Sequence, residues 1–549
     1  MSLDPVDYAV ISQSLIAAST EMGAKLVRSA YSTIVREASD AAAAILDADG
    51  NTVCQAELIP VQLGSLAATF QPCARLYPPT ELRDGDFYIT NDPYHGGQHL
   101  PDIFIFTPIL DDGALLSFTA TVAHHIDVGG GAPGLNMSAR ELIQEGLIIP
   151  PSRFNLARDW NGGPFERLIA ANIRVPDQTI GDLNAQFAGN SIGATRVRQL
   201  CRKFGTGRVL ETMGEMMNYS ERRMRAAIAS APEGVYVGED RIDDDGAGGG
   251  PVVIRATVTI KGDTLAIDFA GTGPQVPTNM NCPFASTLAA AYGCVKAVLT
   301  DPTTPFNAGS TRMVTVTAPF GSILNPKPPA PVRARMTPVN RVFDAVMKAL
   351  AQAVPEKAIA TGFDTTTGPY LSRRRDGRYR VYHEVMGGGY GASAGADGCS
   401  GVDGPMSNCA NAPVESLDMD FDFFRVVEYG LIPDSGGAGR TRGGLGIRRR
   451  YEILKDGVEY AQYGDRFEFR AEGLLGGAPG APASCTITRD GRTTALKSKD
   501  WAELRKGDVL TVSTGGGAGY GPSAERPRAK ALADVDEGLV TRQGGAGNG

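Results

Sequence analysis

The sequence is poor in several features that place a protein in a common class. Its 549 residues include five histidines and two tryptophans, and its formal net charge is −8. An acidic balance argues against nucleic acid or an anionic membrane as a partner, because either favours a basic protein surface. No apolar run reaches the roughly 18 residues needed to cross a bilayer, and the first residues lack the basic and apolar regions of a signal peptide. We therefore expect a cytoplasmic protein that binds neither nucleic acid nor membrane.

Several catalytic motifs are also missing. The glycine clusters contain neither the G-x-x-x-x-G-K-[ST] loop nor a G-x-G-x-x-G framed by a strand and a helix, so no nucleotide site is expected on this chain. No cysteine carries the signature of a nucleophile paired with histidine. The eight cysteines form no C-x-x-C pair, and we expect them to be reduced and mostly buried.

Length and composition indicate a globular chain with several domains. Hydrophobic residues make up 42% of the sequence and charged residues 21%, and such a length suggests roughly two to four domains. Apolar residues recur at helical spacing over 6–35, 181–230 and 337–353. Residues 252–269 predict a hairpin, and 356–521 is β-rich and interrupted by glycine. We expect an α+β, multi-domain fold with mixed sheets, long helices in the N-terminal half and a glycine-rich, β-heavy C-terminal half.

Changes in composition and periodicity suggest where the domains divide. The expected parts are an N-terminal α/β domain over 1–240 with the candidate metal site, a middle α/β domain over 241–355, a β-rich C-terminal domain over 356–523, and a polar tail over 524–549 that we expect to be loose. The acidic run 239–250 at the first boundary predicts a turn or linker, because it lacks the ligand spacing and terminal glutamate of a calcium loop.

Four of the five histidines lie between residues 90 and 130. Neutral imidazole and carboxylate are ligands of divalent metals such as zinc, manganese or iron, and they are also the usual groups for proton transfer near neutral pH. His99 and Asp102 are three residues apart across a proline, so a turn can aim both at one ion; a hydrogen-bonded structural pair is the alternative. Predicted strands at 103–109 and 115–123 adjoin these positions, which lets the side chains converge at strand ends.

The second histidine pair and its neighbours allow several roles. His124 and His125 point to opposite faces if they continue a strand, so one is expected to reach the ion. The other histidine would orient the first, contact the substrate, or be buried with its hydrogen bonds made. Asp127 lies on the same side as His125. Asp92 belongs to a turn signature over 91–94, in which capping of its own backbone is the alternative to a chemical role.

Other charged positions are also open to more than one interpretation. Glu37 and Asp40 lie just past the first helix and before an apolar strand, where a solvated helix end is the alternative to a functional role. Arg333 and Arg335 can bind a carboxylate or phosphate, or they can form a structural salt bridge. His383 is the one histidine outside the cluster, and no role is assigned to it.

Taken in order along the chain, these motifs resemble the hydantoinase B/oxoprolinase family. That family includes hydantoinase B subunits, the C-terminal part of 5-oxoprolinases, and large subunits of acetone and acetophenone carboxylases. The resemblance covers nearly the whole chain. The matching segments are 28–32, 36–40, 47–50, 59–65, 91–102, 124–130, 145–151, 181–186, 305–309 and 434–446, followed by the terminal glycine block.

The resemblance implies a B-type subunit that works with an A-type, ATP-hydrolysing partner in a hetero-oligomer. The partner would bind ATP with magnesium and phosphorylate the substrate, and the B-type chain would act on the activated species at its own metal site. The leading hypothesis is an ATP-dependent hydrolase of a cyclic amide such as a hydantoin, an oxoproline or a lactam. A ketone carboxylase subunit and a non-catalytic scaffold are the alternatives.

The resemblance also implies a set of metal ligands. In the carboxylase relatives these are a glutamate, a histidine, an aspartate and a second histidine, which bind a divalent ion such as zinc, manganese or iron. The matching positions in this sequence are Glu37, His99, Asp102, and His124 or, alternatively, His125. The metal would act as a Lewis acid on substrate oxygen or lower the pKa of a bound water.

Catalytic roles follow from the same resemblance. His125 or Asp127 would shuttle the proton, and Asp92 is a further catalytic candidate. The chain departs from the family at Gln62, where many members carry histidine, and within 36–40, where relatives usually have a bulkier basic residue.

Overall fold

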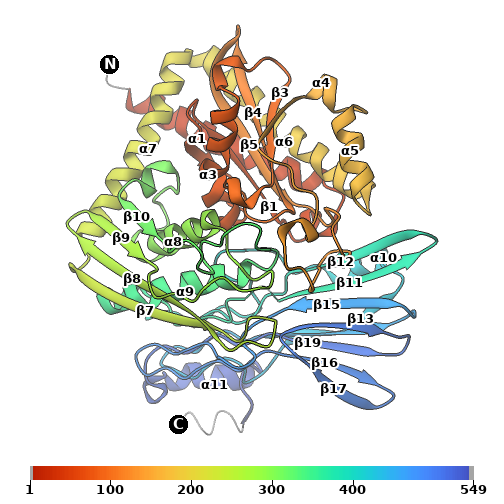
Figure 1. The fold of residues 1–549 in the computed structure, drawn as a ribbon. Coiled ribbons are helices and arrows are strands. Elements are labelled where there is room, and N and C mark those ends of the chain that lie inside the picture. The colour runs from red at the N-terminus through yellow and green to blue at the C-terminus, as the bar shows by residue number, and fades with distance from the viewer. Residues whose placement is uncertain (1–3, 366, 543–549) are drawn as a thin grey trace.

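The computed structural model describes residues 4–365 and 367–542, and its N-terminal part is organised around a six-stranded antiparallel sheet (Figure 1). The strand order is β2-β1-β5-β4-β3-β6. The strands are β1 (Ala41–Leu46), β2 (Thr52–Gln55), β3 (Asp86–Thr90), β4 (Asp102–Asp111), β5 (Ala114–His124) and β6 (Ser152–Asn155). Helices α1 (Pro5–Ser29) and α6 (Pro176–Phe204) cover one face, and α3 (Pro60–Leu76) covers the other. All of β1 is therefore buried.

A four-stranded sheet forms the middle of the chain, with the order β10-β9-β8-β7. The strands are β7 (Gly234–Ile242), β8 (Val252–Lys261), β9 (Thr264–Asp268) and β10 (Val314–Thr317). Helix α9 (Met336–Ala353) packs on β7 and β8, and α8 (Phe284–Leu299) packs between α9 and α3. The α8 helix thereby joins the middle of the chain to the N-terminal sheet.

The C-terminal part contains two sheets with a shared apolar core (Figure 1). One sheet has the order β12-β11-β15-β18, and the other has the order β13-β14-β19-β16-β17. The strands are β11 (Gly368–Arg375), β12 (Arg378–His383), β13 (Phe424–Leu431), β14 (Ile447–Ile453), β15 (Val458–Tyr463), β16 (Ser484–Arg489), β17 (Arg492–Leu496), β18 (Lys499–Leu504) and β19 (Val509–Ser513). The remaining helices are α2 (Thr33–Arg36), α4 (Leu156–Asp159), α5 (Pro164–Asn172), α7 (Thr206–Ala229), α10 (Val414–Asp420) and α11 (Arg528–Asp536).

Three glycine-rich segments, 387–391, 435–446 and 515–521, pack backbone against backbone in the C-terminal part. The amide of Gly517 donates to the carbonyl of Gly444 at 3.0 Å, and its carbonyl accepts from Gly437 at 2.8 Å. A Cβ atom at position 517 would lie 1.9 Å from a backbone oxygen. Glycine is required here because the neighbouring chains leave no space for a side chain.

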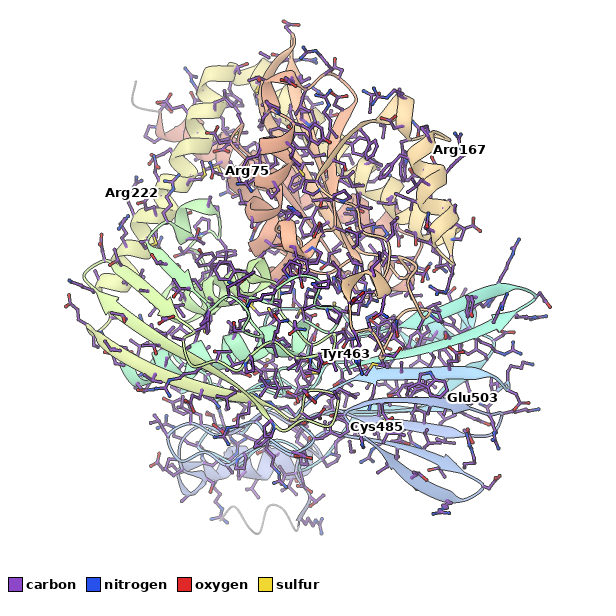
Figure 2. The ribbon with its side chains drawn as sticks, in the orientation of Figure 1. Arg75, Arg167, Arg222, Tyr463, Cys485 and Glu503 are labelled. Carbon is purple, nitrogen blue, oxygen red and sulfur yellow. The ribbon has the colours of Figure 1, made fainter. Side chains whose placement is uncertain are left out.

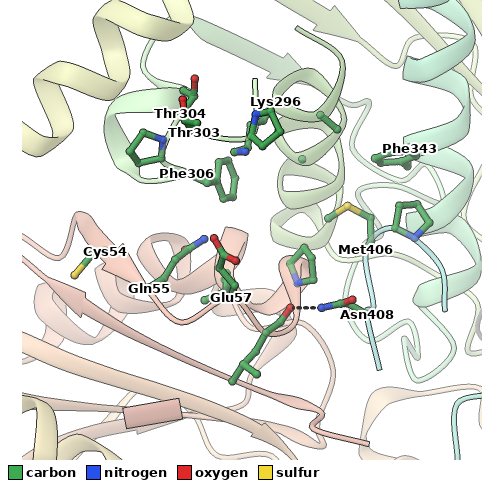
Figure 3. A pocket seen from close by; sticks show the side chains of 18 of the residues that line it. Cys54, Gln55, Glu57, Lys296, Thr303, Thr304, Phe306, Phe343, Met406 and Asn408 are labelled. Carbon is green, nitrogen blue, oxygen red and sulfur yellow. Dashed lines mark hydrogen bonds between the residues drawn. The ribbon is translucent and has the colours of Figure 1, made fainter. Parts of the chain in front are cut away.

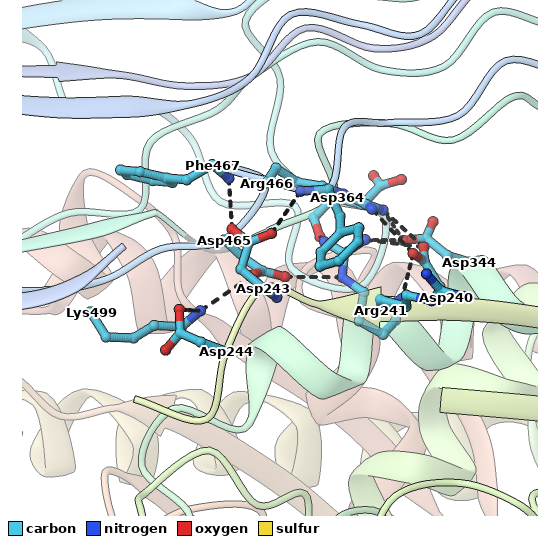
Figure 4. Close-up of polar contacts among 12 residues, drawn as sticks. Asp240, Arg241, Asp243, Asp244, Asp344, Asp364, Asp465, Arg466, Phe467 and Lys499 are labelled. Atoms are coloured by element: carbon cyan, nitrogen blue, oxygen red, sulfur yellow. Dashed lines mark hydrogen bonds and ion pairs between the residues drawn. The ribbon is translucent and has the colours of Figure 1, made fainter. Parts of the chain in front are cut away.

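A buried charge network joins the middle of the chain to the C-terminal sheets (Figure 4). The Arg341 guanidinium lies 3.3 Å from Asp240 and 3.4 Å from Asp465, and the Arg466 guanidinium lies 2.9 Å from Asp240 and 2.8 Å from Asp344. Each of these groups is almost fully buried. Because removing one member leaves another charge uncompensated, the network ties β7 and α9 to the segment after β15.

The structure confirms the expected α+β fold with several mixed sheets, and the predicted hairpin over 252–269 is β8 and β9. The predicted helix over 181–230 is instead two helices. Gly205 separates α6 from α7, and its φ of 86° cannot continue a right-handed helix. Seven of the eight cysteines are buried and all are free, as expected. Within the described residues, no helix combines the length and apolar character needed to cross a bilayer.

The expectation of a loose tail is wrong for much of the segment over 524–549. Helix α11 lies in it, and Arg526 holds it through ion pairs to Asp397 at 2.8 Å and to Asp534 at 2.7 Å. Residues 543–549 lie outside the described part of the chain. The ion pair to Asp397 could not be predicted from the polar composition of the tail, because Asp397 is distant in sequence.

We expect Gly517→Ala to destabilise the protein by roughly 3 kcal/mol, since the added Cβ would overlap the carbonyl oxygen of Tyr390 and force the packed backbones apart. Gly430→Ala on β13 is the matched control, because nothing lies within 4 Å of its added Cβ. The midpoint of chemical denaturation measures the effect. Equal midpoints for the two variants would contradict the packing argument.

Candidate metal centre

The register of three neighbouring strands brings the acidic and histidine side chains to one end of the N-terminal sheet. Asp102 begins β4 and is paired with His124, the last residue of β5. On the other side of β5, the amide of His124 donates to the carbonyl of Asp40 at 3.0 Å, just before β1 begins. His99 lies in the turn before β4, and the amide of Asp102 donates to its carbonyl at 3.0 Å. Antiparallel pairing thus assembles residues that are far apart in sequence.

The side chains of His99, Asp102 and His124 form a compact group. One ligand atom from each lies within 4.8 Å of the others. Nδ1 of His99 is 2.9 Å from a carboxylate oxygen of Asp102, and Nδ1 of His124 is 3.8 Å from the other oxygen. Nδ1 of His124 is also 3.4 Å from Asp40. All four side chains are buried, so Asp40 stands beside the group as a second carboxylate.

The imidazoles have the character of metal ligands. Nε2 of His99 and Nε2 of His124 are buried without a hydrogen-bond partner among the described residues, although buried polar atoms are normally satisfied. Burial, assisted by Arg335, holds the pKa of His99 well below its usual range, and burial with His99 nearby does the same for the pKa of His124. Neutral imidazole is the form that binds a divalent ion. The donor set therefore fits a divalent metal.

The two carboxylates are held by neutral and cationic donors. Arg335, the residue before α9, donates to Asp102 and, at 2.9 Å, to the side-chain oxygen of Gln98. Nε2 of Gln62 donates to Asp40 at 2.8 Å and to Asp102 at 3.2 Å. Burial, reinforced by Asp102, raises the pKa of Asp40 to about 8. In the absence of a further cation, burial thus favours the protonated form of Asp40 near neutral pH.

The C-terminal part supplies the other wall of the site. His383, the last residue of β12, lies with its ring centre 5.5 Å from that of His124. Tyr370 lies opposite His383 on the neighbouring strand β11, and the two rings are stacked with 3.8 Å between their centres. A cavity of about 20 Å³ lies between Asp40, His124, Arg335, His383 and Tyr463, among other residues. Figure 2 labels Tyr463 at the junction of the N-terminal and C-terminal parts.

The structure places Glu37 outside this group. Its carboxylate accepts a hydrogen bond from Arg36 at 2.8 Å, and Arg36 also pairs with Asp420 at 2.8 Å. Glu37 is the residue directly after the short helix α2, and its side chain stays partly exposed. Asp40, three residues later in the same motif, occupies the position beside the histidines because it directly precedes β1. The prediction of Glu37 as a ligand has no geometric support.

His125 and Asp127 lie away from the cluster. His125 points to the face covered by α6, where its Nε2 donates to the side-chain oxygen of Gln186 at 3.0 Å. Burial lowers the pKa of His125. Asp127 accepts hydrogen bonds from the amide and the guanidinium of Arg174. Both side chains have structural partners, so their proposed role as proton shuttles has no support in the geometry.

Asp92 caps its own turn. Its carboxylate accepts from the amide of Tyr94 at 2.9 Å and lies 2.8 Å from Nδ1 of His95. The 3₁₀ turn Pro93–His95 that it begins is the structural alternative that the sequence left open. Asp92 is outside the group of possible metal ligands.

The sequence indicates no role for Gln62 or His383 and leaves Asp40 and Arg335 undecided. Asp40 lies in the same segment, 36–40, as Glu37. Its position directly before an expected apolar strand was the signal that favoured it over Glu37. Gln62 was notable as a departure from the resembled family, and it contacts both carboxylates. Arg335 and His383 reach the site from positions more than 200 residues away, so no local pattern could have placed them.

Comparison with known proteins gives a consistent family. The hydantoinase B/oxoprolinase profile matches residues 4–523. The chain is similar to an uncharacterized protein of Methanocaldococcus jannaschii, with 35% identity over 98% of this chain and 94% of that one. It is also similar to a putative D-/L-hydantoinase B subunit of Pseudomonas sp. (strain NS671), with 32% identity over 98% of this chain and 94% of the other.

Two solved structures resemble the fold. The ATP-dependent caprolactamase from Pseudomonas jessenii superposes with a TM-score of 0.91 and 28% identity, covering 99% of this chain and 96% of that one. A nucleotide-free acetone carboxylase superposes with a TM-score of 0.90 and 18% identity, covering 99% of this chain and 79% of the other. At that lower identity the second likeness shows the fold alone.

We expect the purified chain to bind a divalent metal and His99→Ala to lose it, because the variant removes one of the three buried candidate ligands. His95→Ala is the matched control, since that imidazole is 55% exposed and pairs with Asp92. Metal content by elemental analysis, with circular dichroism to verify folding, distinguishes them. Equal metal content in the two variants would show that the ion binds elsewhere.

We expect Asp40→Asn to weaken metal binding by about 10- to 100-fold, the usual cost of losing a carboxylate in or next to a ligand set. Glu37→Gln should leave the affinity unchanged, because its carboxylate faces Arg36. Competition with a chelator of known affinity measures both. If Glu37→Gln were the weaker binder, the geometric assignment of Asp40 would be wrong.

Proposed function

The chain belongs to the hydantoinase B/oxoprolinase family, and on that premise we propose that it is the metal-binding B-type subunit of an ATP-dependent hydrolase of cyclic amides. In this proposal an A-type partner uses ATP and magnesium to phosphorylate a hydantoin, an oxoproline or a lactam. The present chain then opens the activated ring at the His99, Asp102 and His124 cluster. The working enzyme is a hetero-oligomer.

The observation that carries this proposal is the buried cluster with unsatisfied imidazole nitrogens. A purely structural histidine pair would have partners for both nitrogens of each ring, whereas Nε2 of each ring has none among the described residues. A divalent ion bound by His99, Asp102 and His124, with Asp40 beside them, would supply Lewis acidity or lower the pKa of a water. Similarity to a hydantoinase and to a caprolactamase supports a cyclic amide as the substrate.

The surrounding residues orient the ligands. Arg335 and Gln62 both donate to Asp102, which leaves its carboxylate little rotational freedom. Outer partners of this kind set the direction and the affinity of a metal ligand. Arg335 also comes from the start of α9, so the ligand geometry depends on the contact between the middle and N-terminal parts.

The stacked His383 and Tyr370 close the site from the C-terminal side. Burial holds the pKa of His383 well below its usual range, and its Nδ1 is buried without a hydrogen-bond partner among the described residues. A neutral imidazole at the cavity wall can accept a proton from a reacting group. The same wall excludes bulk water, which strengthens electrostatic interactions inside the site.

The proposed division of labour explains why this sequence lacks a phosphate-binding loop. The chain has neither the G-x-x-x-x-G-K-[ST] motif nor a G-x-G-x-x-G framed by a strand and a helix, so its sequence shows no recognisable triphosphate-binding loop. In the proposal, ATP and magnesium therefore bind to the partner. Two related chains are named as the B or beta subunits of their enzymes, which supports assembly with another chain.

We expect the chain and its partner together, but neither alone, to open a hydantoin, 5-oxoproline or lactam ring in the presence of ATP. His99→Ala in the complex should lower the rate of ring opening at least about 100-fold, because the reacting oxygen loses its electrophilic partner. ATP consumption and ring-opened product are measured in the same reaction, with His95→Ala as the control.

Labelled bicarbonate provides the outcome that would contradict this proposal. Incorporation of label into a ketone substrate, in proportion to the ATP consumed, would assign the chain to the carboxylase branch. The absence of both reactions in a folded, metal-loaded complex would favour a non-catalytic scaffold. Ring opening without bicarbonate is the result expected here.

A further inference from the structure

The cavity at the metal cluster is too small for a cyclic amide. Its volume is about 20 Å³, close to the roughly 10–15 Å³ needed to hold one water molecule. A second cavity of about 580 Å³ lies between the N-terminal sheet and helix α8 (Figure 3). Small-molecule sites typically have volumes of about 300–1,000 Å³. We call this second cavity the chamber.

A partition one residue thick separates the chamber from the cluster. It consists of two segments, 58–61 and 406–408, whose successive residues face opposite sides. Leu58 and Pro60 line the chamber, whereas Ile59 and Val61 line the small cavity. In the second segment, Met406 and Asn408 line the chamber, and Ser407 between them lines the small cavity.

Two hydrogen bonds join the segments of the partition. The amide of Val61 donates to the carbonyl of Met406 at 3.1 Å. The side-chain amide of Asn408 donates to the carbonyl of Leu58 at 3.2 Å, as the dashed line in Figure 3 shows. A separation of the two segments would therefore open a direct path from the chamber to Asp40 and His124.

The chamber walls are mainly apolar, with one basic group on the side of α8. Apolar lining residues include Ile16, Val53, Leu63, Phe306, Met347 and Ile359. Lys296 on α8 lies with Phe306 on one wall, and Gln55 and Glu57 lie on the facing wall (Figure 3). Among the described residues, Lys296 has no ion-pair partner, although its side chain is partly buried. Lys357 also lines the chamber and is exposed.

We propose that the chamber binds the activated substrate, an apolar ring that carries a phosphate group, before the ring passes through the partition to the metal cluster. Lys296 binds the phosphate, because a lysine at an apolar wall gains most from an anionic ligand that replaces its lost hydration. The apolar residues hold the ring. The identity of this ligand rests on the proposed function, whereas the anion-binding role of Lys296 can be tested without turnover.

Binding of phenyl phosphate, a small ring with a phosphate group, tests the chamber directly in the purified chain. We expect Lys296→Gln to weaken binding about tenfold, the usual worth of a charge-assisted contact. Glu57→Gln, on the facing wall, should strengthen binding about two- to threefold by removing a repulsive charge. Lys261→Gln, an exposed lysine on β8, is the control and should have no effect. Calorimetry measures all four proteins.

Inorganic phosphate distinguishes recognition of the anion from recognition of the whole ligand. It should bind more weakly than phenyl phosphate and show the same order of variants. Equal binding of phenyl phosphate to the wild type and to Lys296→Gln would overturn the proposal, as would the absence of binding to the wild type. A weakening by Glu57→Gln equal to that by Lys296→Gln would also overturn it.

Obstruction of the chamber tests the route in the assembled enzyme. Ala297, one residue after Lys296, lines the chamber, so Ala297→Trp should lower kcat/KM for ring opening at least about tenfold while metal content is retained. Ala297→Ser is the matched control. Wild-type kcat/KM in a folded Ala297→Trp complex would show that substrate travels elsewhere.

If the proposed function is wrong, the results differ from those that would overturn the chamber proposal. In that case the wild-type complex would open no ring, and the phenyl phosphate measurement would still decide whether the chamber binds an anion through Lys296. Loss of ring opening together with loss of metal in Ala297→Trp would also overturn the route, because the obstruction would then act on the cluster itself.

Discussion

The site depends on one guanidinium placed among buried carboxylates and imidazoles. Arg335 donates to Asp102 at the start of β4, and Asp102 is in turn paired by strand register with His124. Burying a carboxylate without a partner is costly, so this contact fixes the start of α9 against the end of the N-terminal sheet. Gln62 adds a neutral donor between the two acids. The geometry of the His99, Asp102 and His124 cluster is therefore a property of the assembled chain rather than of one domain.

A second buried network repeats this principle where the middle and C-terminal parts meet. Arg341 and Arg466 share Asp240 and Asp344 between them. Because the loss of either guanidinium would strand at least one carboxylate, the two parts cannot separate at low cost. The C-terminal part, anchored in this way, presents His383 and Tyr370 to the cluster. The position of that wall thus depends on charges far from the site.

The sequence predicted what depends on local pattern and missed what depends on distant contacts. The hairpin over 252–269 is set by neighbouring residues, whereas the family resemblance implied His99, Asp102 and one of His124 and His125 as ligands. The choice between Glu37 and Asp40 needed the register of β1, which a motif of five residues does not determine. His383 enters the site only because β12 returns to the N-terminal part. The break at Gly205 was readable in principle, since glycine favours a positive φ.

The partition links the closure of the site to its proposed chemistry. A phosphorylated cyclic amide is an activated species that bulk water would consume, and a sealed cavity prevents such side reactions. The partition is joined by two hydrogen bonds, each of which contributes about 0.5–1.5 kcal/mol net. Breaking them would cost about 1–3 kcal/mol, and separating the segments would in addition expose Ile59, Val61 and Met406, which belong to the main apolar core. The site therefore stays closed to solvent in the ground state, and the proposed passage requires an opening whose cost exceeds that of the two hydrogen bonds.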